Sequence, residues 1–176
     1  MPDDGITDCH KYERHLPHWQ RPGATFFLTF TLRDRHVCDL TRKDIAPLII
    51  DSLFFFHEER YLLFDYTIMP NHVHVLIKPL RAEDGWVPLP RITHSIKSWT
   101  ANEINAILGR RGQLWEEETF DHIVRNVGKL HDIARYIFMN PVKNGLVKRP
   151  ELWPWWGKGS HRCKLPKTKD NEDDDG

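Results

Sequence analysis

The chain has few cysteines and no long apolar run, and both shortages exclude classes of protein. Its three cysteines, Cys9, Cys38 and Cys163, are widely separated and lack the paired spacing of a zinc site or a disulfide framework. No apolar run is long enough to cross a membrane, and the acidic start at Asp3 and Asp4 is unlike a signal peptide. We therefore expect a cytoplasmic protein with no membrane association.

A glycine-rich phosphate-binding loop is also missing, so we expect no nucleotide cofactor. With 176 residues and 40% hydrophobic content, the chain can build one domain with a substantial core. We expect this domain to span residues 1–157, with residues 1–13 flexible. A disordered tail, first basic and then acidic, is expected over residues 158–176.

The net charge of zero hides an uneven distribution of charge along the chain. Residues 170–176 hold five of the 25 acidic residues, which leaves 25 basic and 20 acidic residues over 1–169, a net charge of +5. Basic residues cluster at Lys143, Lys148 and Arg149. This cluster is a candidate surface for an anionic partner such as nucleic acid, and a merely solvated basic surface is the alternative.

Two histidines in a valine-rich segment form a candidate metal site. Residues 72–78 lie between two prolines and have the composition of a strand. Side chains alternate along a strand, so His72 and His74 share one face while Val73 and Val75 lie on the other, the expected core face. Two imidazoles on one face can bind one ion. With 11 histidines, however, the chain holds about 0.7 such pairs by chance, so the pair alone leaves metal binding open.

A second segment, residues 126–141, predicts an amphipathic helix with a phenol and a carboxamide on one face. Its apolar residues recur at helical spacing, Asn126 is a candidate N-cap, and Pro141 is expected to end the helix. Tyr136 and Asn140 are four residues apart and therefore share a face. The alternative is structural, with Tyr136 packing in the core and Asn140 forming a turn at the helix end.

The remaining periodicity predicts an α+β fold. Strands are expected at residues 25–32, 61–68 and 114–124, and helices at residues 44–59 and 91–108. A turn at residues 69–71 predicts that the 61–68 strand and the histidine strand are antiparallel. The order βαββαβα is that of a ferredoxin-like antiparallel sheet with two helices on one face and an added C-terminal tyrosine-bearing helix. That helix is expected on the face that carries His72 and His74.

Five tryptophans are candidates for stacking on nucleic-acid bases. Trp99 and Trp115 fall in segments with apolar periodicity, which favours a place in the core. Trp153, Trp155 and Trp156 follow the last helix among Pro, Gly and Lys residues, so packing and base stacking both stay open for them.

Six motifs carry a resemblance to a known family. They are Leu16-Pro17-His18, Gly23-Ala24-Thr25-Phe26-Phe27, Met69-Pro70-Asn71-His72-Val73-His74, Lys97-Ser98-Trp99-Thr100, Phe120-Asp121-His122-Ile123-Val124-Arg125, and Tyr136-Ile137 through Asn140-Pro141-Val142-Lys143-Asn144-Gly145-Leu146-Val147. In this order they resemble the single-tyrosine transposases of the HUH superfamily, and most closely the REP-associated tyrosine transposases. The resemblance covers about Arg14 to Trp155. The chain departs from the family after Trp153-Pro154-Trp155, where such proteins often continue with serines.

The resemblance implies a metal-dependent enzyme that acts on DNA. In that family two histidines and a polar residue one turn after the tyrosine hold Mg²⁺ or Mn²⁺, and the tyrosine is the nucleophile. By resemblance, His72, His74 and Asn140 are the metal ligands and Tyr136 attacks phosphorus, which gives a 5′-phosphotyrosine and a free 3′-hydroxyl. The implied partner is single-stranded or hairpin DNA, and the protein is expected to be a monomer or homodimer.

Further basic residues are candidates for contact with DNA phosphates. Besides the cluster after the tyrosine helix, they are Arg91, Lys97 and Arg125, and His122 is an ambiguous candidate. A lone basic residue is more often a solvated surface charge.

Two other functions stay open on sequence grounds. The chain is also compatible with a ferredoxin-like module that binds nucleic acid without cutting it, in which Tyr136 is structural. It is also compatible with a metal hydrolase that uses His72 and His74 with water as the nucleophile. Only the tyrosine enzyme would form a covalent adduct with DNA.

Overall fold

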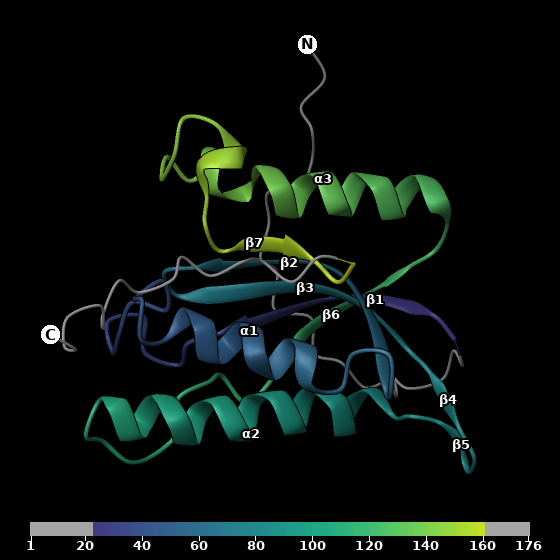
Figure 1. The fold of residues 1–176 in the computed structure, drawn as a ribbon, viewed down its shortest axis with the longest axis horizontal. Helices are drawn as coiled ribbons and strands as arrows, with labels where there is room; N and C mark the ends of the chain where they lie inside the picture. Colours follow the sequence, from purple (N-terminus) through teal and green to yellow (C-terminus); the bar gives the residue numbers. More distant parts are fainter. Residues whose placement is uncertain (1–22, 161–176) are drawn as a thin grey trace, which may run out of the picture.

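The computed structural model describes residues 23–160, and these residues build a mixed α/β fold around one antiparallel sheet (Figure 1). Its five strands are β1 (Thr25–Thr31), β2 (Tyr61–Met69), β3 (His72–Pro79), β6 (Phe120–Val124) and β7 (Trp156–Lys158). Their order in the sheet is β6-β1-β3-β2-β7, and each neighbouring pair is antiparallel. Two short strands, β4 (Arg81–Ala82) and β5 (Gly85–Trp86), form a separate hairpin.

The three α-helices of residues 23–160 lie on the two faces of the sheet. They are α1 (Ala46–Phe55), α2 (Leu89–Ile107) and α3 (Val127–Lys143). Helices α1 and α2 lie together on one face, and α3 covers the opposite face near β2, β3 and β7 (Figure 1). The two helix layers are therefore divided between the faces as the sequence predicts.

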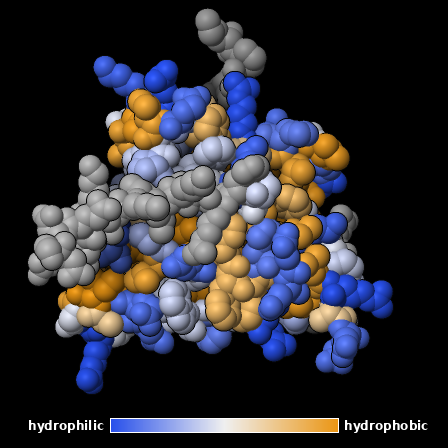
Figure 2. All heavy atoms as spheres, viewed as in Figure 1, coloured by the Kyte–Doolittle hydropathy of each residue, from blue (hydrophilic) through white to orange (hydrophobic). Residues whose placement is uncertain are grey.

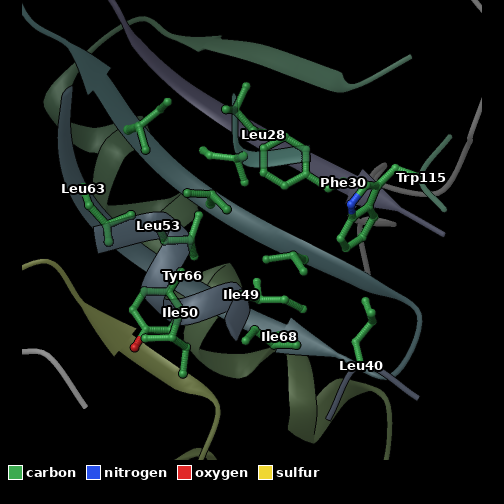
Figure 3. Close-up of a cluster of buried hydrophobic side chains, with 14 of the residues drawn as sticks. Leu28, Phe30, Leu40, Ile49, Ile50, Leu53, Leu63, Tyr66, Ile68 and Trp115 are labelled. Atoms are coloured by element: carbon green, nitrogen blue, oxygen red, sulfur yellow. The ribbon is translucent and has the colours of Figure 1, made fainter. Parts of the chain in front are cut away.

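The apolar core fills the space between the sheet and the α1/α2 layer. Val73, Val75 and Ile77 of β3 are fully buried in it, so the predicted core face of the histidine strand is confirmed. Leu28 and Phe30 of β1 and Ile49, Ile50 and Leu53 of α1 pack in the same cluster (Figure 3). Burying one such side chain contributes about 1.5–3 kcal/mol, so this layer supplies most of the stability of the fold.

Two elements are shorter than the sequence predicts. Helix α1 ends at Phe55 because Glu58 adopts φ 70°, a left-handed conformation that turns the chain into β2. Strand β6 begins at Phe120 rather than Leu114, because Lys97 binds the backbone carbonyls of the segment before it. An isolated β-bridge between Leu32 and Trp115 is the remaining strand-like feature of that segment.

Helix α3 begins where the sequence predicts but ends later. Asn126 is the N-cap, and its Oδ1 atom accepts a hydrogen bond from the Lys129 backbone N–H at 2.9 Å, which confirms its predicted role. The prediction that Pro141 ends the helix is wrong, because α3 continues to Lys143. Proline removes only its own N–H bond, and the next turn closes when the Asn144 N–H donates to the Asn140 carbonyl at 3.0 Å.

The buried face of α2 leaves Trp99 outside the core. Its core residues include one at every fourth position, namely Ile92, Ile96, Thr100 and Ile104. The Thr100 hydroxyl donates to the Ile96 carbonyl and accepts from the Trp115 indole N–H at 3.0 Å, which satisfies it inside the core. Trp115 is buried as predicted, but Trp99 stands one position off this row and is 42% exposed, so its predicted core position is wrong.

The C-terminal tryptophans attach β7 and the preceding turn η1 (Pro150–Leu152) to the rest of the fold. Trp155 is buried in the core, the Trp153 indole N–H donates to the Ile68 carbonyl at 3.1 Å, and the Trp156 ring lies 4.6 Å from that of Phe138. These contacts favour packing over base stacking for all three.

The fold continues past the domain end expected at residue 157. Strand β7 includes Lys158, and the Gly159 N–H donates to the Phe64 carbonyl at 3.0 Å. The motif at residues 16–18, the segment expected to be flexible at 1–13, Cys9, Cys163 and the acidic tail lie outside the described residues. Within residues 23–160, no helix combines the length and the apolar character needed to cross a membrane.

Candidate functional site

His72 and His74 lie on the α3 side of the sheet, with their ring nitrogens directed at each other. Their Nε2 atoms are 3.1 Å apart. His72 Nδ1 lies 2.6 Å from Asn71 Oδ1, and because an amide oxygen only accepts, this nitrogen carries the proton. His72 Nε2 therefore carries a lone pair, which is directed at His74 Nε2. On the other ring, His74 Nδ1 lies 2.8 Å from the Thr29 hydroxyl, which fixes the orientation of that imidazole.

Burial keeps both imidazoles neutral near pH 7. Burial, together with a smaller contribution from the positive charge of Arg35, lowers the pKa of His72 to about 4. Burial likewise lowers the pKa of His74 to about 3, with a smaller contribution from His72. A neutral imidazole offers a lone pair to a metal without first losing a proton.

The separation of the two Nε2 atoms matches that of two ligands of one ion. Adjacent ligands at right angles on bonds of 2.0–2.1 Å are about 3 Å apart, close to the observed 3.1 Å. Hydrogen bonds at the outer ring nitrogens, made here with Asn71 and Thr29, are the usual support for metal-binding histidines. No cluster of three or more His, Cys, Asp or Glu side chains in residues 23–160 is placed to hold a metal, so a third ligand from within these residues would be of another type.

Tyr136 of α3 comes close to this histidine pair. Its ring centroid lies 5.4 Å from that of His74 and 5.9 Å from that of Phe27, which belongs to β1. Lys143, two turns further along α3, places its Nζ atom 5.2 Å from the centroid of the same ring. The structure thus brings together a phenol, an imidazole pair and a cation from distant parts of the sequence.

Asn140 is buried one turn after Tyr136. It is 3% exposed, and its Oδ1 atom accepts from Asn144 Nδ2 at 3.1 Å. An amide oxygen has two lone pairs, so this bond leaves one of them for a further partner. Burial of an amide on the sheet-facing side of α3 is therefore compatible with a ligand role for Asn140.

The predicted basic residues fall in different places. Lys143 lies beside Tyr136, with its Nζ atom over the ring. Lys97 lies on α2, and its Nζ atom donates to the carbonyls of Glu116 and Glu117 at 2.6 and 2.9 Å and to the Thr119 hydroxyl at 3.3 Å. Burial lowers the pKa of Lys97, and its contacts assign it to holding the loop before β6.

The other basic candidates are exposed and spread over the surface. Arg91 is in the first turn of α2, on the opposite side of the sheet from Tyr136, and Arg125 lies between β6 and α3. Lys148 and Arg149 are exposed between α3 and η1. The outer surface of the α3 layer, at the top of Figure 2, mixes hydrophilic and hydrophobic side chains.

Three residues of the site were not found from the sequence as functional candidates, namely Phe27, Thr29 and Asn71. Thr29 meets His74 because the two residues are directly paired between β1 and β3. Alternation within one strand does not reveal such a cross-strand pair. Asn71 does stand directly before the histidines, so its position in the motif was the available signal.

Comparisons with known proteins agree with the motifs. No family model matches the chain. It is 29% identical over 134 residues to the REP-associated tyrosine transposase of Escherichia coli (strain K12), across 76% of this chain and 75% of that protein. It is 24% identical over 145 residues to a protein of Haemophilus influenzae named as a putative REP-associated tyrosine transposase, across 76% of this chain and 78% of that one.

A solved structure shares the fold. It is a REP-associated tyrosine transposase bound to a REP hairpin, and it matches with a TM-score of 0.66 at 22% identity, across 82% of each chain. At this identity the match supports the fold alone. Together with the two relatives, it confirms that the chain resembles the REP-associated tyrosine transposases.

Proposed function

We propose that this protein is a tyrosine transposase, a metal-dependent endonuclease and strand transferase for single-stranded DNA. The observation that carries the proposal is the position of the Tyr136 ring, 5.4 Å from His74, whose Nε2 atom faces that of His72. A phenol beside two neutral imidazoles is the set that a metal-assisted attack of tyrosine on a phosphodiester requires. The two relatives named as tyrosine transposases support the same role.

The proposed ligands of Mg²⁺ or Mn²⁺ are His72 Nε2, His74 Nε2 and Asn140 Oδ1. When bound, the metal supplies Lewis-acid chemistry that offsets negative charge on the scissile phosphate. Two imidazoles among three ligands favour Mn²⁺ over Mg²⁺, which prefers a shell of oxygen atoms. Asn71 and Thr29 hold the two imidazoles in the orientation that presents their Nε2 atoms.

Tyr136 is the proposed nucleophile. Its hydroxyl oxygen forms a bond to phosphorus and loses its proton, while the bond from phosphorus to the 3′ oxygen breaks and that oxygen takes up a proton. The products are a 5′-phosphotyrosine and a free 3′-hydroxyl. A phenol in water has a pKa of about 10, so a base, a metal or a nearby cation must assist the attack. We propose Lys143 as this cation, because its Nζ atom lies 5.2 Å from the centroid of the Tyr136 ring.

The phosphotyrosine link also explains strand transfer without a nucleotide cofactor. The link retains the energy of the cleaved phosphodiester, so the 3′-hydroxyl of another strand end can reverse the reaction. A flexible single strand reaches a site between a sheet and a helix more easily than a stacked duplex does. The relative bound to a REP hairpin supports hairpin-forming repeats as the substrate.

The architecture supports a further assignment. We propose that strands β6, β1, β3 and β2 with helices α1 and α2 form a ferredoxin-like unit, to which α3 and the edge strand β7 are added. The cytoplasmic location and the monomeric or homodimeric state stay predictions.

One assay separates the proposed function from its alternatives. The protein is incubated with hairpin DNA labelled at its 3′ end and with Mn²⁺, and the products are separated on a denaturing gel. The 3′ label stays on the fragment that the 5′-phosphotyrosine joins to the protein. We expect cleavage together with a labelled protein–DNA band that survives denaturation and disappears when a chelator replaces the metal. Cleavage without that band would identify a water-using hydrolase. Binding without cleavage under any metal would identify a nucleic-acid-binding module.

A further inference from the structure

A row of aromatic rings leads from Tyr136 to the edge of the sheet. The Phe27 ring lies 5.9 Å from that of Tyr136 at an interplanar angle of 86°, and the Phe120 ring lies 6.4 Å from that of Phe27 at 75°. Both are edge-to-face contacts, which hold the rings in defined orientations. Phe120 is the first residue of β6, the strand at one edge of the sheet.

Phe120 faces the same side of the sheet as the histidine pair. Thr29 of β1 is paired with His74 on one side and with Phe120 on the other. Directly paired residues of antiparallel strands point to the same face, so the rings of His74 and Phe120 lie on the face covered by α3. The row therefore starts at the proposed nucleophile and ends at the surface beside it.

The exposure of Phe120 is unusual for a large apolar side chain on a sheet. It is 53% exposed, and no other large apolar side chain of the five-stranded sheet within residues 23–160 is exposed to this degree. Apolar surface next to a proposed active site marks a place for a ligand. We propose that Phe120 is a platform on which one base of the substrate strand stacks, about one or two nucleotides from the bond that Tyr136 attacks. This inference rests on the proposed function and adds a base-binding subsite to it.

The charges along β6 predict the direction in which the bound DNA strand runs. His122 is paired with Phe27 and exposed, so it shares the face of Phe120, and Arg125 is exposed just after the end of β6. Both can approach phosphates. In the other direction, Glu116, Glu117 and Glu118 are exposed and repel them. We therefore place the stacked base at Phe120 and its neighbouring phosphates toward His122 and Arg125.

Binding is tested in a Tyr136→Phe background, so that cleavage does not disturb the measurement. Fluorescence anisotropy with a labelled single strand should show that Phe120→Ala weakens binding by about 5-fold to 150-fold, the effect of one lost base–aromatic stack. Phe120→Trp should retain the affinity, because the indole also offers a stacking face. The matched control is Phe55→Ala, which removes a phenyl ring that is 73% exposed on α1, on the opposite face of the sheet, and should leave the affinity unchanged.

A second measurement locates the stacked base. 2-Aminopurine is placed at each nucleotide around the cleavage position, since its fluorescence is quenched when it stacks. We expect one position next to the scissile bond whose quenching is lost in Phe120→Ala and kept in Phe120→Trp. Circular dichroism and thermal melts compare the fold of each variant with that of the parent.

The outcomes separate this inference from the proposed function. Equal affinity of the Phe120→Ala and Phe55→Ala variants would overturn the platform, as would quenching that persists without the Phe120 ring. If the protein with Tyr136 intact neither cleaves DNA nor forms an adduct, but binding still depends on Phe120, the platform stands and the proposed function fails. If no variant binds a single strand, both fail.

Discussion

The two faces of the sheet bury different kinds of side chain. The face toward α1 and α2 packs aliphatic and aromatic residues such as Val73, Val75 and Ile77. The face toward α3 buries Met69 and Leu76, but beside them it also buries the polar Asp65, Thr67 and His74, and Asn140 of α3 is buried as well. Buried polar groups cost stability unless they are hydrogen-bonded, so these polar residues contribute less to folding than their burial suggests. The difference indicates that most of the apolar core lies on one face of the sheet, while the proposed site lies on the other.

The largest expected effect is on chemistry and comes from Tyr136→Phe. Removing one hydroxyl should lower cleavage by at least about a thousand-fold and abolish the covalent adduct, because no other group replaces the nucleophile. The ring contacts with His74 and Phe27 are retained, so the thermal midpoint should stay close to that of the parent. Gel assays and melts measure the two properties. An adduct that persists in this variant would eliminate Tyr136 as the nucleophile.

The next largest effects are expected at positions of β3 whose side chains point to opposite faces of the sheet. Ile77→Ala should lower the free energy of unfolding by about 2–5 kcal/mol, because it leaves a cavity in the α1/α2 layer. Replacing both His72 and His74 by alanine should instead abolish cleavage while the secondary structure is retained. Denaturant unfolding and circular dichroism measure these effects.

The same histidine variant tests the metal. Mn²⁺ should raise the melting temperature of the parent, since a ligand that binds only the native state stabilises it, and should not raise that of the double variant. An equal increase in both proteins would show that the metal binds elsewhere. The Ile77→Ala variant is the control, because it should keep the increase.

Much of this two-faced arrangement could be predicted from the sequence, because it depends on local periodicity. Alternation along residues 72–78 separated the histidines from the core valines, and Asn126 marked the start of α3. The spacing of Tyr136 and Asn140 put both on one helix face. These features need no knowledge of how the elements pack.

The features that were missed depend on contacts between distant segments. Thr29 supports His74 only through the register of β1 and β3, and the short β6 results from the contacts of Lys97 with the preceding loop. Trp99 is exposed because Thr100 takes the core-facing position of that turn of α2, where it accepts a hydrogen bond from Trp115. Pro141 remains inside α3 because the next turn closes without its N–H. None of these contacts follows from periodicity within one element.

A smaller effect on chemistry is expected at Lys143. Lys143→Met should slow adduct formation by about 10-fold to 100-fold, because the proposed role of its positive charge is to offset the negative charge that develops around Tyr136 and the phosphate during the attack. Lys143→Arg should restore most of the rate, because arginine keeps the positive charge. The affinity of the Lys143→Met variant for a labelled single strand is measured beside its rate. An affinity that falls by the same factor as the rate would assign Lys143 to DNA binding instead of the attack by Tyr136.

The smallest effect is the dependence of the free energy of unfolding on pH, which we expect to have opposite signs at two carboxyl groups, Asp65 and Asp44. Burial raises the pKa of Asp65 on β2, although the charge of Lys158 opposes this shift. A raised folded-state pKa gives stability that is present below the unfolded pKa and is lost as the pH rises through the folded pKa. Asp65→Asn should therefore be more stable than the parent at pH 7, within about 1 kcal/mol, and should lose this advantage as the pH falls.

Asp44, before α1, is the matched control with the opposite sign. A hydrogen bond from Arg42 lowers the pKa of this exposed carboxyl, so its contribution is present above the unfolded pKa and is lost as the pH falls. Asp44→Asn should therefore be slightly less stable than the parent at pH 7 and converge with it in acid. Urea unfolding of the parent and both variants at pH 7 and near pH 3 measures the two differences. If both variants changed in the same direction, burial of Asp65 would not be the cause, and the polar α3 face would carry no cost from this carboxylate.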